Sequence, residues 1–407
     1  MKYLIENIGT LVTLEKASQK KGRKIISKDL SLLHNTSLLI EGGMIKEISS
    51  KKTNRAAKKI NAKGNALLPG FVDAHTHLVF AGNRAFEFEF RSQGKTYEEI
   101  HARGGGILST VEKTRKASQE ELFEKAFHYL KKVKESGTTT IEIKSGYGLS
   151  PRDEIKILKV IQKLQKEKIL TIIPTFLGAH TIPKEYKNNP NFYVELLCKG
   201  MIPQVSEEKL AEFCDIFIEK GSFTLKQAEK ILETASKYKL KIKVHTEQFN
   251  NIGGSALALN YKATSIDHLE KISEKNIKKI SQSQTTATLL PGVSFFLGLN
   301  QAPARKLLDS GARVAIASDF NPGSSMSFSM PLMGTIAMTQ MKMTLSEALV
   351  ASTLNGAYSL GIEKQTGSLE VGKRADLILL NEPEYRIPFY HFGLNHIQKT
   401  YSYLDFP

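Results

Sequence analysis

From residue 66 onward the chain alternates between short runs of consecutive apolar residues and longer stretches in which apolar residues recur every three or four positions. The runs are typical of strands buried on both faces of a parallel sheet, and the longer stretches are typical of amphipathic helices. The predicted helix at Glu120–Ser136 shows the second pattern. One of its faces carries Leu122, Phe123, Ala126, Leu130 and Val133.

Eight apolar runs follow one another in this part of the chain. Further helices are predicted between them, around residues 153–166 and 228–235. Eight strands alternating with helices favour an α/β protein with a TIM-like (β/α)8 barrel, although a doubly wound open sheet is an alternative. The runs occupy residues 66–75, 138–146, 170–180, 214–221, 240–247, 263–270, 285–292 and 312–323.

Both ends of the chain have a different pattern, with strand-like segments and turn glycines such as Gly42 and Gly43. We expect residues 1–64 and 365–407 to pair into a small β-sandwich domain. The barrel domain would then comprise residues 65–364.

Composition and charge restrict the classes of function that the chain could have. The chain has 407 residues, is 41% hydrophobic and carries a formal net charge of +16. Its basic runs are short and lack interleaved aromatic residues, which favours a solvated basic surface over a nucleic-acid site. Cys198 and Cys214 have no metal-type or redox-type spacing, so they are interpreted as core residues. Without a recognisable signal peptide or an apolar stretch long enough for a membrane span, a cytoplasmic protein is expected.

The candidate chemistry lies at the ends of the predicted strands. His75 and His77 share one face of the first strand, because side chains alternate along a strand. His245 and Asp319 lie at or just past the apolar parts of the fifth and eighth runs. The carboxyl ends of barrel strands meet at one face of the barrel, so these side chains are predicted to converge. Three imidazole nitrogens and one carboxylate suit Zn²⁺ or iron, with room for water.

These motifs resemble the amidohydrolase superfamily, and within it the imidazolonepropionase family of histidine degradation. The long stretch His75–Arg115 carries the closer resemblance. Residues 142–149, 175–180, 318–324 and 390–395 are also similar, and residues 366–380 resemble the superfamily's closing segment. The similarity covers nearly the whole chain and is weakest in the first sixty residues. The last residues, 398–407, depart from the family's usual glycine-containing ending.

The resemblance implies a role for each matching residue. His75, His77, His245 and Asp319 match the family's metal ligands, and His268 matches a histidine near the reacting carbonyl. Some relatives carry glutamate where this chain has Gln248, and glutamine cannot act as a general base. The expected substrate contacts are Arg84, Tyr97, Tyr147, His180, Gln248, Asn321, Gly323 and Ser324.

The expected reaction is metal-dependent hydrolysis of the cyclic amide of 4-imidazolone-5-propanoate to N-formimidoyl-L-glutamate. Asp319 would transfer protons and His268 would stabilise the oxyanion. One divalent metal, Zn²⁺ or Fe²⁺/³⁺, is expected. A small-molecule substrate and a homodimer are also implied, without nucleic acid or membrane partners.

Several alternatives remain open at this point. Another mononuclear amidohydrolase, such as a nucleobase-type deaminase, would use the same ligands. A non-catalytic barrel is less consistent with a complete ligand set. Lys144 or Lys220 could bridge a second metal after carbamylation. The glycines of Arg103–Leu108 suggest a loop that closes over the substrate, because the phosphate-binding pattern is absent.

Overall fold

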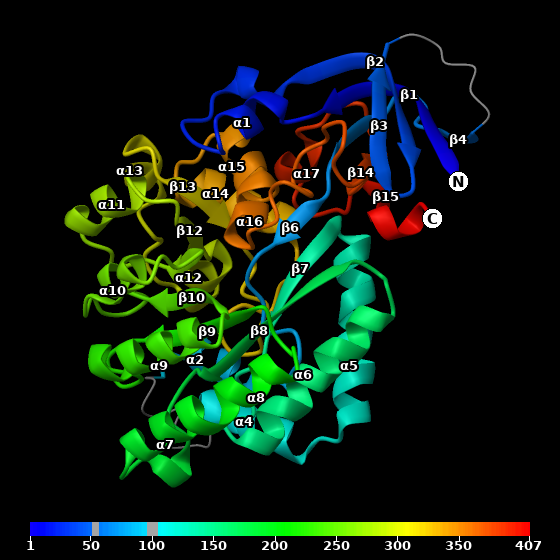
Figure 1. Cartoon of the computed structure of the whole chain (residues 1–407). Helices are drawn as coiled ribbons and strands as arrows, with labels where there is room; N and C mark the ends of the chain where they lie inside the picture. The colour runs from blue at the N-terminus through cyan, green and yellow to red at the C-terminus, as the bar shows by residue number, and fades with distance from the viewer. Residues whose placement is uncertain (51–56, 96–104) are drawn as a thin grey trace.

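The computed structural model describes residues 1–50, 57–95 and 105–407, which fold around two sheets (Figure 1). The larger sheet has eight strands in sequence order, from β6 to β13. Each neighbouring pair is parallel. The strands are β6 (Phe71–Asp73), β7 (Thr138–Lys144), β8 (Thr171–Ala179), β9 (Phe213–Ile218), β10 (Lys241–Thr246), β11 (Ser265–His268), β12 (Thr286–Leu289) and β13 (Arg313–Ile316).

The first and last strands of this series meet at their carboxyl ends. Thr76 forms a parallel bridge to Phe320. On either side of it, His77 N donates to Phe320 O and Asp319 N donates to His75 O, each at 3.0 Å. Elsewhere along this seam, helix α16 (Leu354–Ser359) packs against β6, β12 and β13. The expected (β/α)8 barrel is therefore confirmed, with one seam held by a backbone bridge and a helix.

Helices alternate with these strands and cover the outside of the barrel (Figure 1). The predicted helix at Glu120–Ser136 is confirmed as α5 (Gln119–Glu135), and its five apolar residues are all buried. Ser118 caps it by accepting from Glu121 N. The other helices are α1 (Glu15–Gln19), α2 (Ala85–Ser92), α4 (Ile107–Lys116), α6 (Pro151–Lys166), α7 (Pro190–Leu196), α8 (Ile202–Glu207), α9 (Leu225–Lys237), α10 (Gly254–Asn260), α11 (Glu274–Ser281), α12 (Pro291–Leu297), α13 (Ala304–Asp309), α14 (Met330–Gln340), α15 (Leu345–Ala351) and α17 (Ile387–Tyr390).

The second sheet combines both ends of the chain. Its seven strands are mixed in direction, and β14 pairs with β5 in the middle of the sheet. The two termini lie side by side, where Met1 N donates to Pro407 O at 3.1 Å (Figure 1). The strands are β1 (Lys2–Val12), β2 (Leu32–Glu41), β3 (Met44–Ser49), β4 (Lys58–Asn61), β5 (Ala66–Pro69), β14 (Leu377–Leu380) and β15 (Ile397–Tyr401).

The run at residues 66–75 differs from the single strand expected there. The structure splits it into β5, in the terminal sheet, and β6, in the barrel. Gly70 lies between them against Thr139, and a Cβ at Gly70 would come within 2.2 Å of Thr139 Oγ1. The split passes through a position where only glycine fits. The division into domains at residues 64 and 365 stays a prediction.

Among the described residues, no helix is both long and apolar enough to cross a bilayer.

Candidate metal centre and active site

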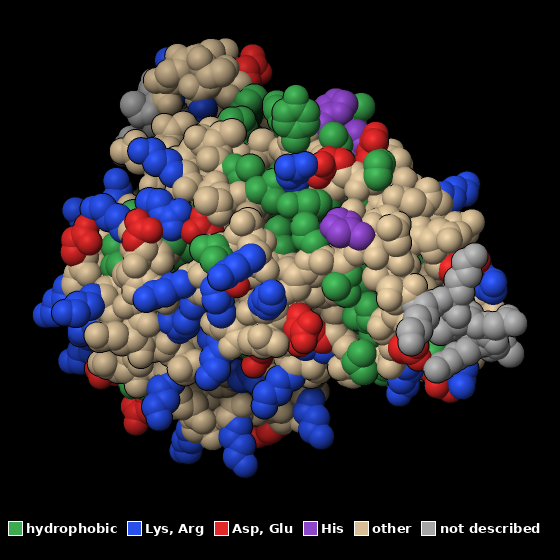
Figure 2. Space-filling view, turned by 90° about the horizontal axis from the view of Figure 1, so that it is seen from above, with side chains coloured by type: hydrophobic (Ala, Val, Ile, Leu, Met, Phe, Trp, Pro, Cys, Tyr) green, Lys and Arg blue, Asp and Glu red, His purple; other side chains and the backbone are tan. Residues whose placement is uncertain are grey.

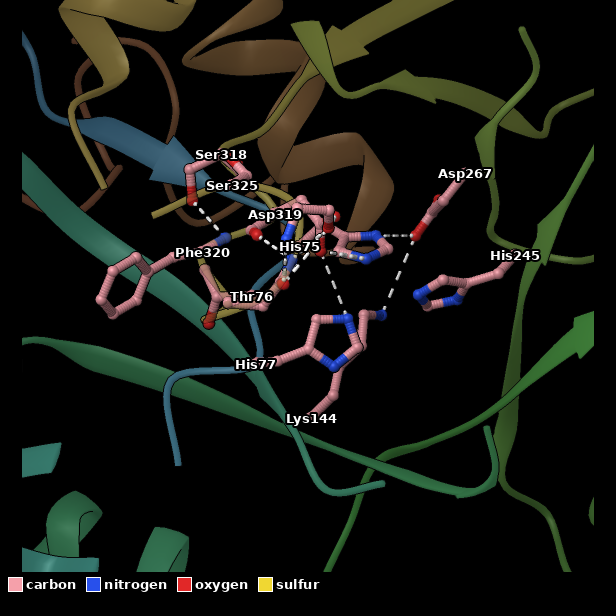
Figure 3. Close-up of polar contacts among 12 residues, drawn as sticks. His75, Thr76, His77, Lys144, His245, Asp267, Ser318, Asp319, Phe320 and Ser325 are labelled. Carbon is pink, nitrogen blue, oxygen red and sulfur yellow. Dashed lines mark hydrogen bonds and ion pairs between the residues drawn. The ribbon is translucent and has the colours of Figure 1, made fainter. Parts of the chain in front are cut away.

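The carboxyl ends of β6, β10 and β13 bring His75, His77, His245 and Asp319 together (Figure 3). His268, at the end of β11, joins the same cluster. His75 Nε2 lies 3.4 Å and His77 Nε2 3.3 Å from Asp319 Oδ1. The ring of His75 is centred 4.3 Å from that of His245. Ligand atoms of His75, His77 and Asp319 form one group within 4.8 Å, and those of His75, His245 and His268 form a second. His75 therefore belongs to both groups.

The donor atoms of this cluster fit a bound metal ion. His75 Nε2, His245 Nε2 and Asp319 Oδ1 are buried, and none of them has a hydrogen-bond partner among the described residues. Buried polar atoms are normally paired, because an unpaired one costs about 1–3 kcal/mol. Imidazole nitrogens and a carboxylate oxygen are ligands that zinc and iron accept. The four predicted ligands could hold one divalent ion between them, with His268 beside it.

The backbone turns sharply where these side chains leave the strands. His268 and Asp319 have positive φ angles of 82° and 49°, and Glu247 follows β10 with a φ of 58°. Non-glycine residues rarely adopt this region, and such residues cluster at functional sites. At Asp319 the conformation is held by the hydrogen bond to His75 O described above. The positive φ angles at these strand ends thus mark this end of the barrel as a candidate functional site.

Beneath the imidazoles lies a network of buried charges. Lys144 Nζ is 2.7 Å from Asp215 Oδ2 and 2.8 Å from Glu142 Oε2. Lys243 Nζ is 3.4 Å from Glu142 Oε2 and 3.6 Å from Asp267 Oδ2, and it also donates to Ala74 O at 2.8 Å. All five side chains are fully buried. The two lysines thus stand among three carboxylates in the barrel interior.

Two of these carboxylates contact the candidate metal ligands directly. Asp267 Oδ2 lies 2.6 Å from His75 Nδ1, and Asp215 Oδ2 lies 2.9 Å from His245 Nδ1. A carboxylate at Nδ1 holds the proton there and leaves Nε2 free to bind a metal. The hydrogen bond to Asp267 therefore fixes the tautomer and the orientation of His75, whereas Asp215 is close to His245 Nδ1 without forming a hydrogen bond to it.

The electrostatics of the network follow from its composition. Burial would lower the pKa of Lys144, but the charges of Asp215 and Glu142 outweigh burial and raise it. Burial would raise the pKa of Asp319, yet the contacts and charges of His75 and His77 hold it well below its usual range. Asp319 is thus a carboxylate at neutral pH. Lys144 is an ammonium rather than the neutral amine that carbamylation requires, and Lys220 is exposed.

Tyr147 and His180 form one wall beside His77. His180 stacks on His77 with ring centres 5.0 Å apart, and the Tyr147 ring lies 5.5 Å from His180. His180 Nδ1 lies 3.0 Å from Gly146 O. Burial and the neighbouring charge of His77 lower the pKa of His180 to about 3. His180 is therefore neutral and can donate or accept a hydrogen bond at this wall.

The loop after β13 forms a compact turn next to Asp319. Asn321 Oδ1 accepts from Gly323 N at 2.8 Å and from Ser324 N at 2.9 Å. Ser324 Oγ donates to Asp319 Oδ2 at 3.3 Å. The predicted substrate contacts Asn321, Gly323 and Ser324 are therefore adjacent to the candidate metal ligands.

The three remaining predicted substrate contacts, Arg84, Gln248 and Tyr97, differ in their placement. Arg84 immediately precedes α2 and is paired with Glu87. Gln248 lies half-buried in the loop after β10. Tyr97 falls outside the described residues, as do Arg103 and Gly104 of the predicted closing loop.

The buried network was not anticipated from the sequence, apart from Lys144 as a possible bridge. The sequence does contain a pattern that could have indicated this network: charged residues occur at alternate positions within the apolar runs. Glu142 and Lys144 are two apart on β7, and Lys243 and His245 are two apart on β10. Such spacing places both members of a pair on the same face of a strand.

Known proteins are similar to this chain in sequence and in fold. Residues 66–402 match the model of the amidohydrolase family. An imidazolonepropionase of Thermoanaerobacter pseudethanolicus is 46% identical over 342 residues, 84% of this chain and 82% of that protein. An imidazolonepropionase of Porphyromonas gingivalis is 41% identical over 406 residues, 98% and 96% of the two chains. Among solved structures, a triazine hydrolase variant superposes with a TM-score of 0.78 at 16% identity, covering 99% of this chain and 94% of its own, which shows the fold alone.

Proposed function

The chain belongs to the imidazolonepropionase family of the amidohydrolases, and from this premise we propose that it hydrolyses 4-imidazolone-5-propanoate to N-formimidoyl-L-glutamate. In this reaction the oxygen of water bonds to the ring carbonyl carbon. The bond from that carbon to the ring nitrogen breaks, and a proton passes to the nitrogen. The identity of the substrate rests on the two relatives named above.

We propose His75, His77, His245 and Asp319 as the ligands of one Zn²⁺ or iron ion. The observation that carries this proposal is the set of buried nitrogen and oxygen atoms at the end of the barrel that have no hydrogen-bond partner among the residues the structure describes. A divalent ion held there would supply the Lewis acidity that makes water a usable nucleophile near neutral pH. Asp267 orients the imidazole of His75 through Nδ1, and Asp215 lies beside Nδ1 of His245.

Proton transfer is assigned to Asp319. Its carboxylate has one oxygen toward the imidazoles and the other toward the hydroxyl of Ser324. It can take a proton from water and later deliver it to the leaving ring nitrogen. His268, in the same group as His75 and His245, is assigned to donate to the oxyanion that forms at the carbonyl.

Ring binding is assigned to the wall of Tyr147 and His180. The propionate carboxylate is assigned to the side where Arg84 and the loop Asn321–Ser324 meet. A pocket built for a carboxylate rejects compounds that lack one, since its buried donors would be left unpaired.

The test is an ultraviolet assay that follows loss of the imidazolone chromophore, with mass spectrometry of the product and metal analysis of the same sample. We expect N-formimidoyl-L-glutamate without release of ammonia. An imidazolone lacking the propionate should be hydrolysed at least about tenfold less efficiently in kcat/KM. Stoichiometric ammonia release, or equal efficiency on both compounds, would favour a deaminase instead.

A further inference from the structure

We propose that Glu87 is a positioning residue that fixes the guanidinium of Arg84 as the carboxylate-binding group of the active site. The proposal rests on the proposed function and extends it to a residue outside the set of ligands and substrate contacts. Glu87 lies on α2, one turn after Arg84, and is almost fully buried.

The contacts of Glu87 lock the plane of the guanidinium. Arg84 Nε donates to Oε1 at 2.7 Å and Arg84 Nη2 donates to Oε2 at 2.6 Å. Oε1 also accepts from Gly106 N at 2.9 Å. Two parallel hydrogen bonds between a guanidinium and a carboxylate fix both position and orientation, which a single bond would not.

The loop after β13 closes on the other side of the same guanidinium. A Cβ at Gly323 would lie 2.0 Å from Arg84 Nη1, so a larger residue there would displace the guanidinium. Arg91, at the end of α2, donates from Nη1 and Nη2 to Gly323 O, at 3.2 Å each. Helix α2 thus holds Arg84 through Glu87 and holds the opposing loop through Arg91.

This arrangement leaves one end of the guanidinium for a ligand. Within the described parts of the chain, Arg84 Nη1 has no hydrogen-bond acceptor. The side chain is 11% exposed. It lies near Tyr147, where its charge opposes the effect of burial on the tyrosine's pKa. A positive charge held still at the edge of the site, with free N–H groups, suits the propionate carboxylate better than the neutral ring.

A purely stabilising ion pair explains these contacts less well. Glu87 and Arg84 are only three residues apart, so the ion pair itself links no distant parts of the chain, and Glu87 does so only through its hydrogen bond from Gly106 N. Buried ion pairs contribute little net stability, because desolvation offsets their attraction. The pair makes more sense as a means of preorganising Arg84 before the substrate arrives.

The experiment is a double-mutant cycle with Arg84→Ala, Glu87→Gln and the double variant, measured on imidazolone propionate. Glu89→Gln, on an exposed face of α2, is the matched control for loss of one charge. Steady-state kinetics give KM and kcat separately. Calorimetric titration with N-formimidoyl-L-glutamate gives binding without turnover, and metal content and melting temperature are measured for every variant.

We expect Glu87→Gln to raise KM about tenfold or more, with a smaller change in kcat, and to weaken product binding in parallel. In the Arg84→Ala background the same substitution should change kcat/KM by less than about twofold, because no guanidinium remains to be positioned. Glu89→Gln should stay within about twofold of the unmodified enzyme.

Independent effects that multiply in the double variant would overturn the proposal, as would a Glu87→Gln enzyme with unchanged KM. If Glu87→Gln does not fold, Glu87→Asp replaces it in the same cycle, since it keeps the charge but is too short for both bonds. An unmodified enzyme that does not hydrolyse imidazolone propionate refutes the proposed function and this inference with it. If the unmodified enzyme is active and Arg84→Ala raises KM but the Glu87 variants do not, the inference about Glu87 is refuted and the proposed function stands.

Discussion

The surroundings of Asp319 restrict what this single carboxylate can do. Its backbone is held in a left-handed conformation by the bridge between the first and last strands. One oxygen faces His75 and His77, and the other accepts from Ser324 Oγ. Both oxygens therefore have an assigned direction, one toward the metal position and one toward the substrate loop.

Replacing Asp319 with asparagine should leave the enzyme nearly inactive even where metal is retained. An amide oxygen can still approach a metal, but an amide cannot shuttle a proton at neutral pH. The measurement is kcat at matched metal occupancy, established by elemental analysis. Near-normal turnover of the metal-loaded variant would rule out the proton-transfer role.

His268→Ala separates a metal ligand from an oxyanion donor. His268 stands in one group with His75 and His245, so its position alone permits both roles. We expect the variant to keep its metal and lose about 100- to 1000-fold in kcat, the usual effect of removing one oxyanion donor. Metal analysis alongside the kinetics decides the matter, because loss of the ion would reassign His268 as a ligand.

Lys144 is the residue on which the buried network depends most. Its ammonium contacts Glu142 and Asp215, with Asp267 at 3.8 Å, and all are fully buried. Lys144→Met should lower the free energy of unfolding by about 3–5 kcal/mol, because it leaves buried carboxylates without their counter-charge. Urea denaturation measures this, with the exposed Lys220→Met as the control, for which no significant change is expected.

At the scale of elements, the seam between β6 and β13 is closed by the tight packing of α16. Helix α16 lies so close to β6 that a Cβ on Gly356 would be 2.6 Å from Val72 O. The glycine is therefore required by packing rather than by backbone conformation, since its φ is not positive.

Gly356→Ala should destabilise the protein by about 1–3 kcal/mol, although alanine normally stabilises a helix by about 1 kcal/mol relative to glycine. The matched control is Gly200→Ala in the helical segment Leu197–Met201, where the nearest atom to the added Cβ is 3.6 Å away. Thermal or urea unfolding of both variants gives the comparison. A Gly356 variant as stable as the control would show that the seam can relax.

At the scale of the whole molecule, basic side chains are spread widely. Figure 2 shows Lys and Arg side chains scattered over much of one face, with acidic side chains among them. Many of them form surface ion pairs, such as Lys163 with Glu120 and Lys199 with Glu195. The basic side chains on this face are interspersed with acidic ones, and the solvated basic surface stays a prediction.

The molecule should bind about one divalent metal per chain. A further group of possible ligands consists of Asp215, His245 and Asp267, but the ammonium of Lys144 already lies beside its two carboxylates. Removing the metal with a chelator should lower the melting temperature, since a ligand at one hundred times its Kd stabilises the folded state by about 2.7 kcal/mol. Re-addition of Zn²⁺ should restore it. Elemental analysis giving two ions per chain would contradict this assignment and bring a bridging lysine back into consideration.

The sequence by itself determined the elements and the positions of the candidate ligands. Buried parallel strands impose continuous apolar runs, and helices impose a period of three to four residues, so both patterns are local and can be read directly. His245, His268 and Asp319 lie at or near the carboxyl ends of their strands, as the runs indicate, and their roles stay predictions. The split of residues 66–75 between two sheets was not visible, because it depends on Thr139, far along the chain.

Only the tertiary structure decided which side chains meet inside the barrel. Asp215 and His245 come from neighbouring strands, while His75 and Asp267 come from strands that are distant in the sheet order. The partnership of Arg84 with Glu87 and its contact with Gly323 likewise require α2 to fold over the loop after β13. Such contacts depend on the closure of the barrel, a long-range event that no local pattern of residues encodes.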